Sequence, residues 1–325
     1  NIVHVCIQDL IRHRTHCAPP FASTSSLLRL RIEHASDSDF LTTRLDESAG
    51  CFIMTLQSVK VAVVAITIGL LWGFDITRFL RSFQVHTNGV ILISGASSGI
   101  GFDVARELGA TGWTVLAGVR NKAGATRVAS LAGVTPVYLD VTNDTQITKA
   151  VAFAASIAEK ENIQFVGLVN NAGYGDDLPV EFLTRNRIYN VFDSNVFGSV
   201  VLTAAALPHL RANKGRIITV TSFSSNIAPP GMQPYVASKA AQRAFFESTR
   251  REVTSFGVSV SIVEPGCIKT SFFNDKFFDN DNTRSLSTHE TIILDEVYAE
   301  MESAREDTLR RCLKHGAEPS VSTTP

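Results

Sequence analysis

Cysteine is scarce in this sequence, and neither sign of charge is in excess. The five cysteines show no C-x-x-C spacing and their number is odd, which excludes a complete disulfide framework. We therefore expect reduced thiols and no bound metal. Lys and Arg number 30 against 31 Asp and Glu, so no basic surplus is present to bind nucleic acid. Apolar residues nevertheless make up 45% of the chain, which is enough for a sizeable core.

Methionine is absent from the beginning of the chain, since Met54 is the first. Residues 1–53 lack helical or strand periodicity and mix charged with polar side chains. Three interpretations remain open: a targeting extension, a small extra domain, or sequence upstream of a true start at Met54. The acidic side chains in this region argue against an organellar transit peptide. We expect it to be disordered or not part of the native protein.

An uncharged segment follows between Lys60 and Asp75. It is shorter than the about 20 apolar residues of a spanning helix, but Lys60 can extend its ammonium towards lipid headgroups. We predict an apolar membrane anchor and linker over residues 54–87, with residues 59–74 in the membrane. A helix buried in the domain is the alternative. The side chains that favour the anchor, and with it a cytosol-facing domain on the endoplasmic reticulum, are Trp72, Phe74, Arg78 and Arg81.

A regular alternation of apolar segments and helical patterns begins after Asn88. Strands are predicted at residues 89–94, 113–119, 135–141, 164–170, 216–222 and 258–265, with helices between them. Continuous apolar strands that alternate with helices indicate a parallel sheet covered on both faces. With right-handed crossovers this is a doubly wound α/β sheet of the Rossmann type, in a single domain over residues 88–325.

The first strand ends in a glycine-rich turn that opens a helix. It reads Gly95-Ala96-Ser97-Ser98-Gly99-Ile100-Gly101. Small residues let backbone N–H groups approach a pyrophosphate, and the dipole at the start of the helix favours an anion. The place of the turn, between a buried strand and a helix, favours nucleotide binding over a turn that serves packing alone.

Further motifs follow at the ends of the later strands and in the helices. They are Asp140-Val141, Asn170-Asn171-Ala172-Gly173, Asn195 in S-N-V-F-G, Ser222, Tyr235 and Lys239 in Y-V-A-S-K, and Pro265-Gly266 with Thr270. Their order and spacing resemble the short-chain dehydrogenase/reductase family over roughly residues 88–275. The resemblance implies an NAD(P)-dependent oxidoreductase that transfers a hydride between a nicotinamide cofactor and an alcohol or ketone carbon.

The resemblance also implies a catalytic set of Asn195, Ser222, Tyr235 and Lys239. A phenol with a pKa of about 10 is a weak base near neutral pH. Residues four apart share a helix face, so Lys239 can place its charge beside the Tyr235 hydroxyl and, with an oxidised nicotinamide, lower its pKa. Ser222 would orient the substrate oxygen. By resemblance Asn195 holds a water that links Lys239 to solvent; an asparagine that only bends its helix is the alternative.

The cofactor-binding residues are implied in the same way. They are Gly95, Ser97, Ser98, Gly99, Ile100, Gly101, Arg120, Asp140, Val141, Asn171, Ala172, Gly173, Tyr235, Lys239, Pro265, Gly266 and Thr270. A carboxylate after the second strand would accept the ribose 2′-hydroxyl of NAD, whereas an arginine accommodates the 2′-phosphate of NADP. The chain has Arg120 there and no carboxylate, which favours NADP(H). NAD(H) remains open, because Arg120 can also be a solvated loop charge.

Two features depart from the family pattern. Ser94 stands where a threonine is usual, and it should keep the hydroxyl group. Residues 287–315 are predicted to form one helix, with Ser287 and Glu290 as a capping box and Gly316 as its stop. No seventh strand follows that helix, so we expect the domain to be truncated at its C-terminal end.

The region after Thr270 is rich in phenylalanine, where the family builds its substrate lid. These side chains are Phe272, Phe273, Phe277 and Phe278, and they suit a retinoid-, steroid- or fatty-ketone-like substrate or else dock the lid on the core. Val263-Glu264-Pro265-Gly266 and the apolar segment resemble the branch of retinol, 17β-hydroxysteroid and 3-hydroxybutyrate dehydrogenases. The competing functions are a catalytically silent nucleotide-binding scaffold and a nucleotide-sugar epimerase, and the epimerase needs a larger C-terminal domain. A homodimer or homotetramer is implied by resemblance alone.

Overall fold

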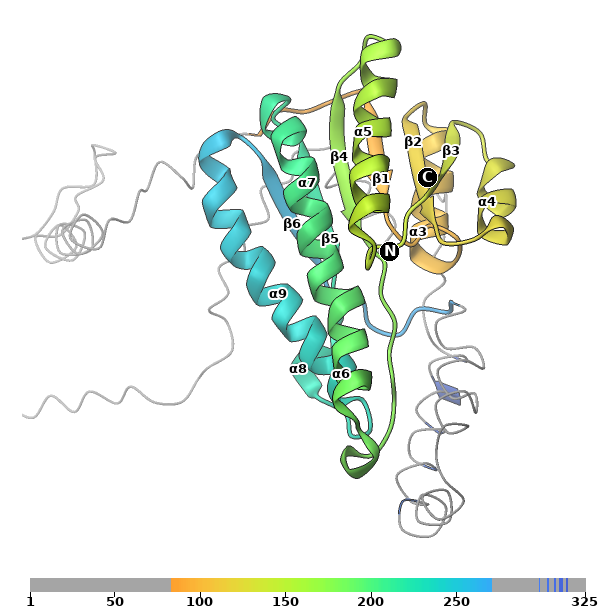
Figure 1. Cartoon of the computed structure of the whole chain (residues 1–325), viewed down its shortest axis with the longest axis vertical. Coiled ribbons are helices and arrows are strands. Elements are labelled where there is room, and N and C mark those ends of the chain that lie inside the picture. The colour runs from red at the N-terminus through yellow and green to blue at the C-terminus, as the bar shows by residue number, and fades with distance from the viewer. Residues whose placement is uncertain are drawn as a thin grey trace, which may run out of the picture. The chain divides into compact units, whose positions relative to one another are not determined.

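Six parallel strands form one sheet at the centre of the structure (Figure 1). Their bounds are β1 (Val90–Ile93), β2 (Thr114–Val119), β3 (Val134–Tyr138), β4 (Phe165–Asn170), β5 (Arg216–Val220) and β6 (Ser259–Val263). The order across the sheet is β3-β2-β1-β4-β5-β6. The computed structural model describes residues 83–270, together with Tyr298, Ser303, Asp307, Arg310, Arg311 and Lys314. Over these residues the predicted doubly wound sheet is confirmed.

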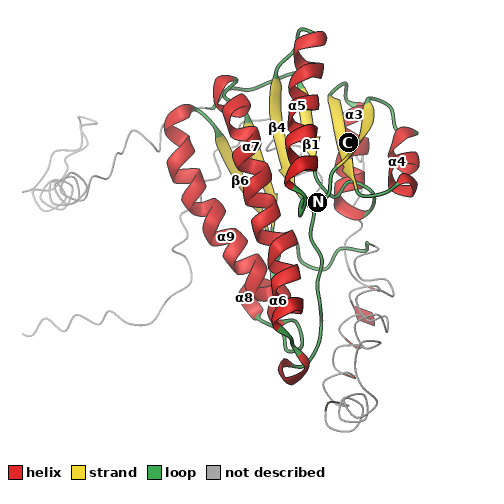
Figure 2. Cartoon of the chain, in the orientation of Figure 1, coloured by secondary structure: helices red, strands yellow, loops and turns green. Residues whose placement is uncertain are grey.

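Helices cover both faces of the sheet (Figure 2). Their bounds are α3 (Gly99–Ala110), α4 (Lys122–Ala129), α5 (Asp144–Lys160), α6 (Arg185–Phe192), the π-helical η3 (Asp193–Phe197), α7 (Gly198–Ala212), α8 (Ser224–Ile227) and α9 (Gln233–Val253), with 3₁₀ turns η2 (Val180–Phe182) and η4 (Thr254–Phe256). Alternate side chains of β1 point to opposite faces: Ile91 and Ile93 join a core with α3 and α4, whereas Val90 and Leu92 join a core with α5, α7 and α9.

Burial explains why the strands form where the sequence predicts them. Every residue of β1, β4 and β5 is buried, as expected for parallel strands that carry helices on both faces. The observed strands are shorter than the predicted ones by one to three residues. The excess falls at strand ends, where the chain leaves the sheet to form the turns that carry the motifs. Because all strands are parallel, these ends meet at one edge of the sheet.

The opposite edge receives the incoming chain. Arg216 Nη2, at the start of β5, donates a hydrogen bond to the Gln84 carbonyl at 3.1 Å. His86 is buried, and its Nε2 lies 3.3 Å from the Lys214 carbonyl. Burial lowers the pKa of His86 below its ordinary value. Residues before β1 are therefore held at the edge that faces away from the motifs.

Several predictions concern residues outside the described part of the chain. These are the predictions for residues 1–53, for residues 54–82 of the predicted anchor and linker 54–87, for the membrane segment 59–74 and for the phenylalanine-rich region, and they stay predictions. Of the predicted helix over residues 287–315, the described positions from Ser303 onwards are helical, but Tyr298 lies in a bend. The predicted helix is therefore not continuous at Tyr298.

Two further observations bear on the expectations from sequence. Among the described helices, residues 185–212 have the length and mean hydropathy (1.3) to cross a membrane, but half of the apolar window is buried in the protein, as in a core helix.

Cys267 is disulfide-bonded, so the expectation of reduced thiols is wrong at this position. An odd number of cysteines excludes pairing of all five but not a single bridge. The other cysteines lie outside the described residues.

Candidate active site

The glycine turn after β1 has a backbone that only glycine adopts easily. Gly95 and Gly99 have φ angles of +65° and +59°. A Cβ atom on Gly101 would lie 2.4 Å from Asn171 Nδ2 and 2.5 Å from the Gly95 carbonyl, so no larger residue fits. Ser98 is the N-cap of α3 but makes no side-chain capping bond, and the first turn of α3 has no acidic residue. The N–H groups at this helix start are thus left for an anion.

Ser94 joins this turn to the Asn-Ala-Gly motif after β4. Its Oγ accepts hydrogen bonds from the backbone N–H groups of Asn171 at 3.0 Å and Ala172 at 3.1 Å, and donates to the Val169 carbonyl at 3.3 Å. Asn171 Nδ2 in turn donates to the Gly95 carbonyl at 2.9 Å. The serine therefore keeps the hydroxyl function expected of it, and the two motifs are fixed relative to each other.

The motifs after β3 and β6 reach the same edge. A Cβ atom on Gly99 would lie 3.3 Å from the Thr270 Cβ, so Thr270 lies beside the glycine turn. The Pro265 carbonyl accepts a hydrogen bond from the Phe223 N–H at 2.9 Å, which fixes the start of that loop. Asp140 is half-buried, and its Oδ1 accepts hydrogen bonds from the N–H and the hydroxyl of Thr142 at 3.0 and 2.8 Å. Four strand ends thus converge on one site.

Asn195 lies in the π-helical segment η3 and is fully buried. Its Oδ1 accepts a hydrogen bond from the Tyr174 N–H at 3.0 Å, and its Nδ2 donates to the Tyr174 carbonyl and to Ser238 Oγ, both at 2.9 Å. A Cβ atom on Gly173 would lie 2.9 Å from Asn195 Oδ1 and 3.2 Å from Lys239 Nζ. The asparagine therefore ties the segment after β4 to α9, next to the lysine. Single π-helical turns of this kind are frequent at functional sites.

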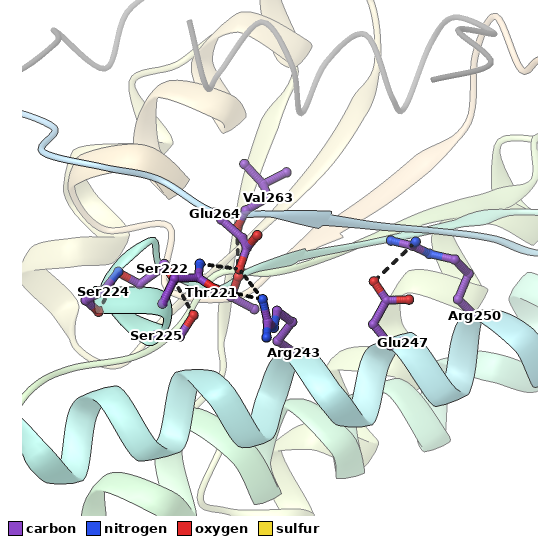
Figure 3. Close-up of polar contacts among 10 residues, drawn as sticks. Thr221, Ser222, Ser224, Ser225, Arg243, Glu247, Arg250, Val263 and Glu264 are labelled. Carbon is purple, nitrogen blue, oxygen red and sulfur yellow. Dashed lines mark hydrogen bonds and ion pairs between the residues drawn. The ribbon is translucent and has the colours of Figure 1, made fainter. Parts of the chain in front are cut away.

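Ser222 follows β5, and Figure 3 shows it beside Ser224 and Ser225 above α9. Its Oγ accepts hydrogen bonds from the Ser224 N–H at 3.2 Å and the Ser224 hydroxyl at 2.9 Å. It is also hydrogen-bonded to the Tyr235 side chain. The serine hydroxyl and the tyrosine hydroxyl, which the sequence places on different elements, are therefore in direct contact.

Lys239 lies one helical turn after Tyr235 on the buried face of α9. Its Nζ donates hydrogen bonds to the Val220 carbonyl at 2.9 Å and to Gln242 Oε1 at 3.1 Å. The same nitrogen lies 5.9 Å from the centre of the Tyr235 ring. Residues Asn195, Ser222, Tyr235 and Lys239 are thus brought together in one place.

The electrostatics of this cluster differ from the prediction. Burial raises the pKa of Tyr235 to about 12, opposed by the hydrogen bond to Ser222 and reinforced by the Asp177 charge. Burial also lowers the pKa of Lys239 to about 7. A lysine with that pKa is only partly charged at neutral pH, so it supplies less positive charge than a solvated ammonium. From the chain's own residues, the pKa of Tyr235 is raised and not lowered.

The cofactor side contains a cation that sequence reasoning missed. Arg127 Nη1, in α4, donates a hydrogen bond to the Ser97 carbonyl of the glycine turn at 3.1 Å. Arg120 is exposed at the end of β2, and no described hydrogen bond or ion pair holds it. The next residue, Asn121, caps α4 by accepting a hydrogen bond from the Gly124 N–H at 2.9 Å. The helical period of α4 is the signal that could have pointed to Arg127.

Other residues of the site were also missed. Ser238 and Gln242 lie three positions after Tyr235 and Lys239, so helical periodicity places them on the same face of α9. Asp176 forms a buried ion pair with Arg187 of α6, at 2.6 Å between Oδ1 and Nη1. Asp177 is buried as well, and no local pattern in the sequence indicates it.

Comparisons with known proteins point to one family. A family model described as short chain dehydrogenase matches residues 89–281, more than half of the chain. The 3-amino-tetrahydro-pyrrolizinone reductase of Xenorhabdus hominickii is 36% identical over 187 residues, which are 58% of this chain and 64% of that protein. Retinol dehydrogenase 5 of Homo sapiens is 35% identical over 211 residues, which are 63% of this chain and 64% of that protein. The chain therefore spans less than two thirds of the length of these relatives.

A solved structure of a short chain dehydrogenase has a similar fold. The crystal structure of a short chain dehydrogenase from Burkholderia cenocepacia in complex with NADP superposes with a TM-score of 0.53 at 31% identity. The superposition covers 59% of this chain and 78% of that one.

Proposed function

The chain belongs to the short-chain dehydrogenase family, and on that premise we propose that it is an NAD(P)-dependent oxidoreductase that acts on an alcohol or ketone. One observation carries the proposal: Ser222, Tyr235 and Lys239 converge at the sheet edge that also holds the glycine turn. The turn suits a dinucleotide, because it is tightly packed with no room for a side chain at Gly101 and the start of α3 has N–H groups that no side chain caps.

The chain's residues would move the proton. The bound nicotinamide would supply or accept the hydride. Ser222 would hold the substrate oxygen by a hydrogen bond next to the Tyr235 hydroxyl. Tyr235, with its pKa raised to about 12, is protonated at neutral pH and is therefore suited to donate a proton to a carbonyl oxygen as hydride reaches the carbon. Reduction of a ketone to an alcohol balances in this way, and the reverse reaction needs a phenolate.

NADP(H) is the preferred cofactor in this proposal. No carboxylate follows β2, where one would accept the 2′-hydroxyl of NAD. Arg120 directly follows β2, and its charge opposes the burial-driven rise in the pKa of Tyr174. Arg127 adds a second cation beside Ser97. Two cations at this end of the site favour the additional phosphate of NADP.

The substrate is proposed to be lipophilic. Leu178 and Phe182, in the loop after β4, are buried, and the ring of Tyr298 packs on Phe182 at 6.1 Å between centroids. These apolar side chains follow directly on the segment that Asn195 holds beside Lys239. Asp177 is also buried in this loop, next to the ion-paired Asp176, and its charge acts on Tyr235. The proposal therefore combines buried apolar side chains in this loop with the Asp177 charge near the Tyr235 hydroxyl.

Membrane and subunit contacts are further parts of the proposal. Residues 59–74 would hold the protein at the membrane of the endoplasmic reticulum, with the domain in the cytosol. A second copy would pair through α6, η3 and α9, where Tyr189, Phe197 and Phe245 are exposed aromatic side chains. Deletion of residues 1–80 should release the protein from the membrane pellet, and full-length protein that stays in the supernatant would contradict the anchor.

The enzyme proposal is tested with purified protein and a panel of retinoids, steroids and aliphatic ketones. NADPH or NADH is added, and oxidation of the cofactor is followed by its absorbance. We expect turnover with NADPH on at least one lipophilic carbonyl. Cofactor binding without turnover of any member, in both directions, would favour the silent nucleotide-binding scaffold. The intact set of four catalytic candidates favours the enzyme.

A further inference from the structure

Gln242 is fully buried one turn beyond Lys239 on α9. Its Oε1 accepts a hydrogen bond from Lys239 Nζ at 3.1 Å. Its Nε2 has no hydrogen-bond partner among the described residues. A buried amide with only one of its two polar ends in use is unusual, because buried polar groups are nearly always paired.

Two further buried polar atoms, on strands β4 and β5, have no described hydrogen-bond partner either. Along α9, Lys239 contacts the Val220 carbonyl of β5, and Phe246 shares a core cluster with Ile217 of the same strand. Gln242 lies between Lys239 and Phe246 on the helix. The two further atoms are Thr219 Oγ1 and Oδ1 of its register partner Asn170 on β4, which are buried without a partner in the described part of the chain. We call Asn170, Thr219 and Gln242 the polar layer.

Packing alone does not explain a glutamine at this position. An unpaired buried donor keeps the full penalty of leaving water, and an apolar side chain of similar volume would avoid that penalty. The surroundings further along α9 are apolar, as Phe246 and Val253 show. The described hydrogen bond that Gln242 makes is directed at Lys239. The residue is therefore better accounted for by what it does to the lysine than by what it adds to the core.

We propose that Gln242 is a positioning residue, whose side-chain carbonyl holds the Lys239 nitrogen against the end of β5 and beside Gly173. The inference deepens the proposed function, because Lys239 is a member of its catalytic set. Without Gln242 the nitrogen would keep one described acceptor, the Val220 carbonyl. An ammonium with fewer acceptors is less well stabilised in a buried place.

No charged side chain in the described part of the chain holds Lys239 Nζ, whose hydrogen bonds go to Val220 and Gln242. Tyr235 lies on the same helix, and Asp177 comes from the loop after β4. Other charges near α9 have partners of their own. Arg187 of α6 pairs with Asp176. Glu264 after β6 pairs with Arg243, and Figure 3 shows this pair. The Asp193 carboxylate of η3 interacts with those of Asp140 and Asp144. Burial is the cause of the low pKa of Lys239. The hydrogen bond that Lys239 Nζ donates to Gln242 Oε1 favours the charged form of the lysine and acts against that effect.

The test measures stability and needs neither substrate nor cofactor. The pKa of Lys239 is about 7 in the folded chain and 10.5 when solvated, so the unfolded chain binds more protons between these values. The free energy of unfolding should therefore rise with pH from about 7 to about 10.5. Lys239→Met should remove this rise. Urea unfolding of the full chain at a series of pH values, compared with Lys239→Met, isolates the lysine.

Three variants then examine Gln242. Gln242→Glu keeps the acceptor and adds a charge, so the start of the rise should move up by about 1–3 pH units. Gln242→Leu removes the acceptor, so the rise should start below pH 7. Thr219→Val is the matched control, because it removes another unpaired group of the polar layer and leaves the lysine contact intact; its profile should match that of the wild type. Profiles for both Gln242 variants that match the control would overturn the inference. If Gln242→Leu does not fold, the Gln242→Glu profile decides alone.

Turnover provides an independent measurement. With an active wild type, Gln242→Leu should lower kcat at least tenfold with little change in KM, and Gln242→Glu should recover part of it with a shifted pH optimum. Equal kcat values for Gln242→Leu and Thr219→Val would contradict a role in the reaction. A wild type without turnover on any substrate would count against the proposed function, whereas the stability profiles would still decide whether Gln242 positions the lysine.

Discussion

The half of the sheet formed by β1–β3 with α3 and α4 contributes a backbone turn to the site, whereas the half formed by β4–β6 with α6–α9 contributes buried side chains. In the first half the functional groups are free N–H groups at the start of α3 and cations at its margin. In the second half Asn195, Tyr235 and Lys239 are almost fully buried. The N–H groups of the turn are held in place by the backbone, and their properties do not depend on burial. The pKa values of Tyr235 and Lys239, in contrast, are set by burial.

The largest effect is expected from a substitution that removes the proton-transfer group in the β4–β6 half and leaves the β1–β3 half unchanged. Tyr235→Phe should lower turnover by about 10²- to 10⁴-fold, because the proton-transfer group is lost while the ring remains in place. The dissociation constant of NADPH, measured by fluorescence, should stay nearly the same. Tyr174→Phe is the control, since the described bonds from Tyr174 to Asn195 are made by its backbone. A variant that keeps more than about a tenth of wild-type turnover would remove Tyr235 from this role.

The next effect is confined to the first half. Arg120→Ala should weaken NADPH binding by about 1.5–3 kcal/mol, as expected for a hydrogen bond to a charged group. Binding of NADH should hardly change, because NADH lacks the 2′-phosphate. Arg127→Ala is measured in parallel, and a smaller loss is expected since its guanidinium already bonds the Ser97 carbonyl. Equal losses for the two cofactors would show that Arg120 does not meet the phosphate.

A third change sharpens the comparison by altering the backbone turn. Gly101→Ala would place a Cβ atom 2.5 Å from the Gly95 carbonyl and should destabilise the protein by about 1–3 kcal/mol, the usual cost of overpacking. The midpoint of thermal unfolding measures this loss. A Cβ atom at Gly266 has nothing within 4 Å, so Gly266→Ala should leave that midpoint nearly unchanged. Similar midpoints for both variants would mean that the turn can open without strain.

The two halves also differ in how well the sequence predicts them. The glycine spacing is a local pattern, and the structure has the close approach of Gly101 to Asn171 that such a pattern requires. The common helix face of Tyr235 and Lys239 was predicted from their spacing of four residues, and their role from the family resemblance. Their pKa values were not, because these depend on burial by segments far away in the sequence. Gln242 was missed because its contacts, and not its type or spacing, distinguish it from an ordinary helical residue.

The smallest expected effect is that of replacing His86. This residue lies at the edge of the sheet opposite the site and takes no part in the proposed reaction. Burial lowers the pKa of His86, so the unfolded chain binds a proton at a higher pH than the folded one. Its contribution to stability is complete above the ordinary value of 6.5 and is lost as the pH falls through the lower folded value. Asp103 behaves in the opposite way, because burial raises its pKa. His86→Gln is therefore compared with the wild type, and the difference in urea midpoint between pH 7 and pH 5 should be smaller in the variant. A difference of the same size in both proteins would show that His86 takes up its proton without opening the contact with Lys214.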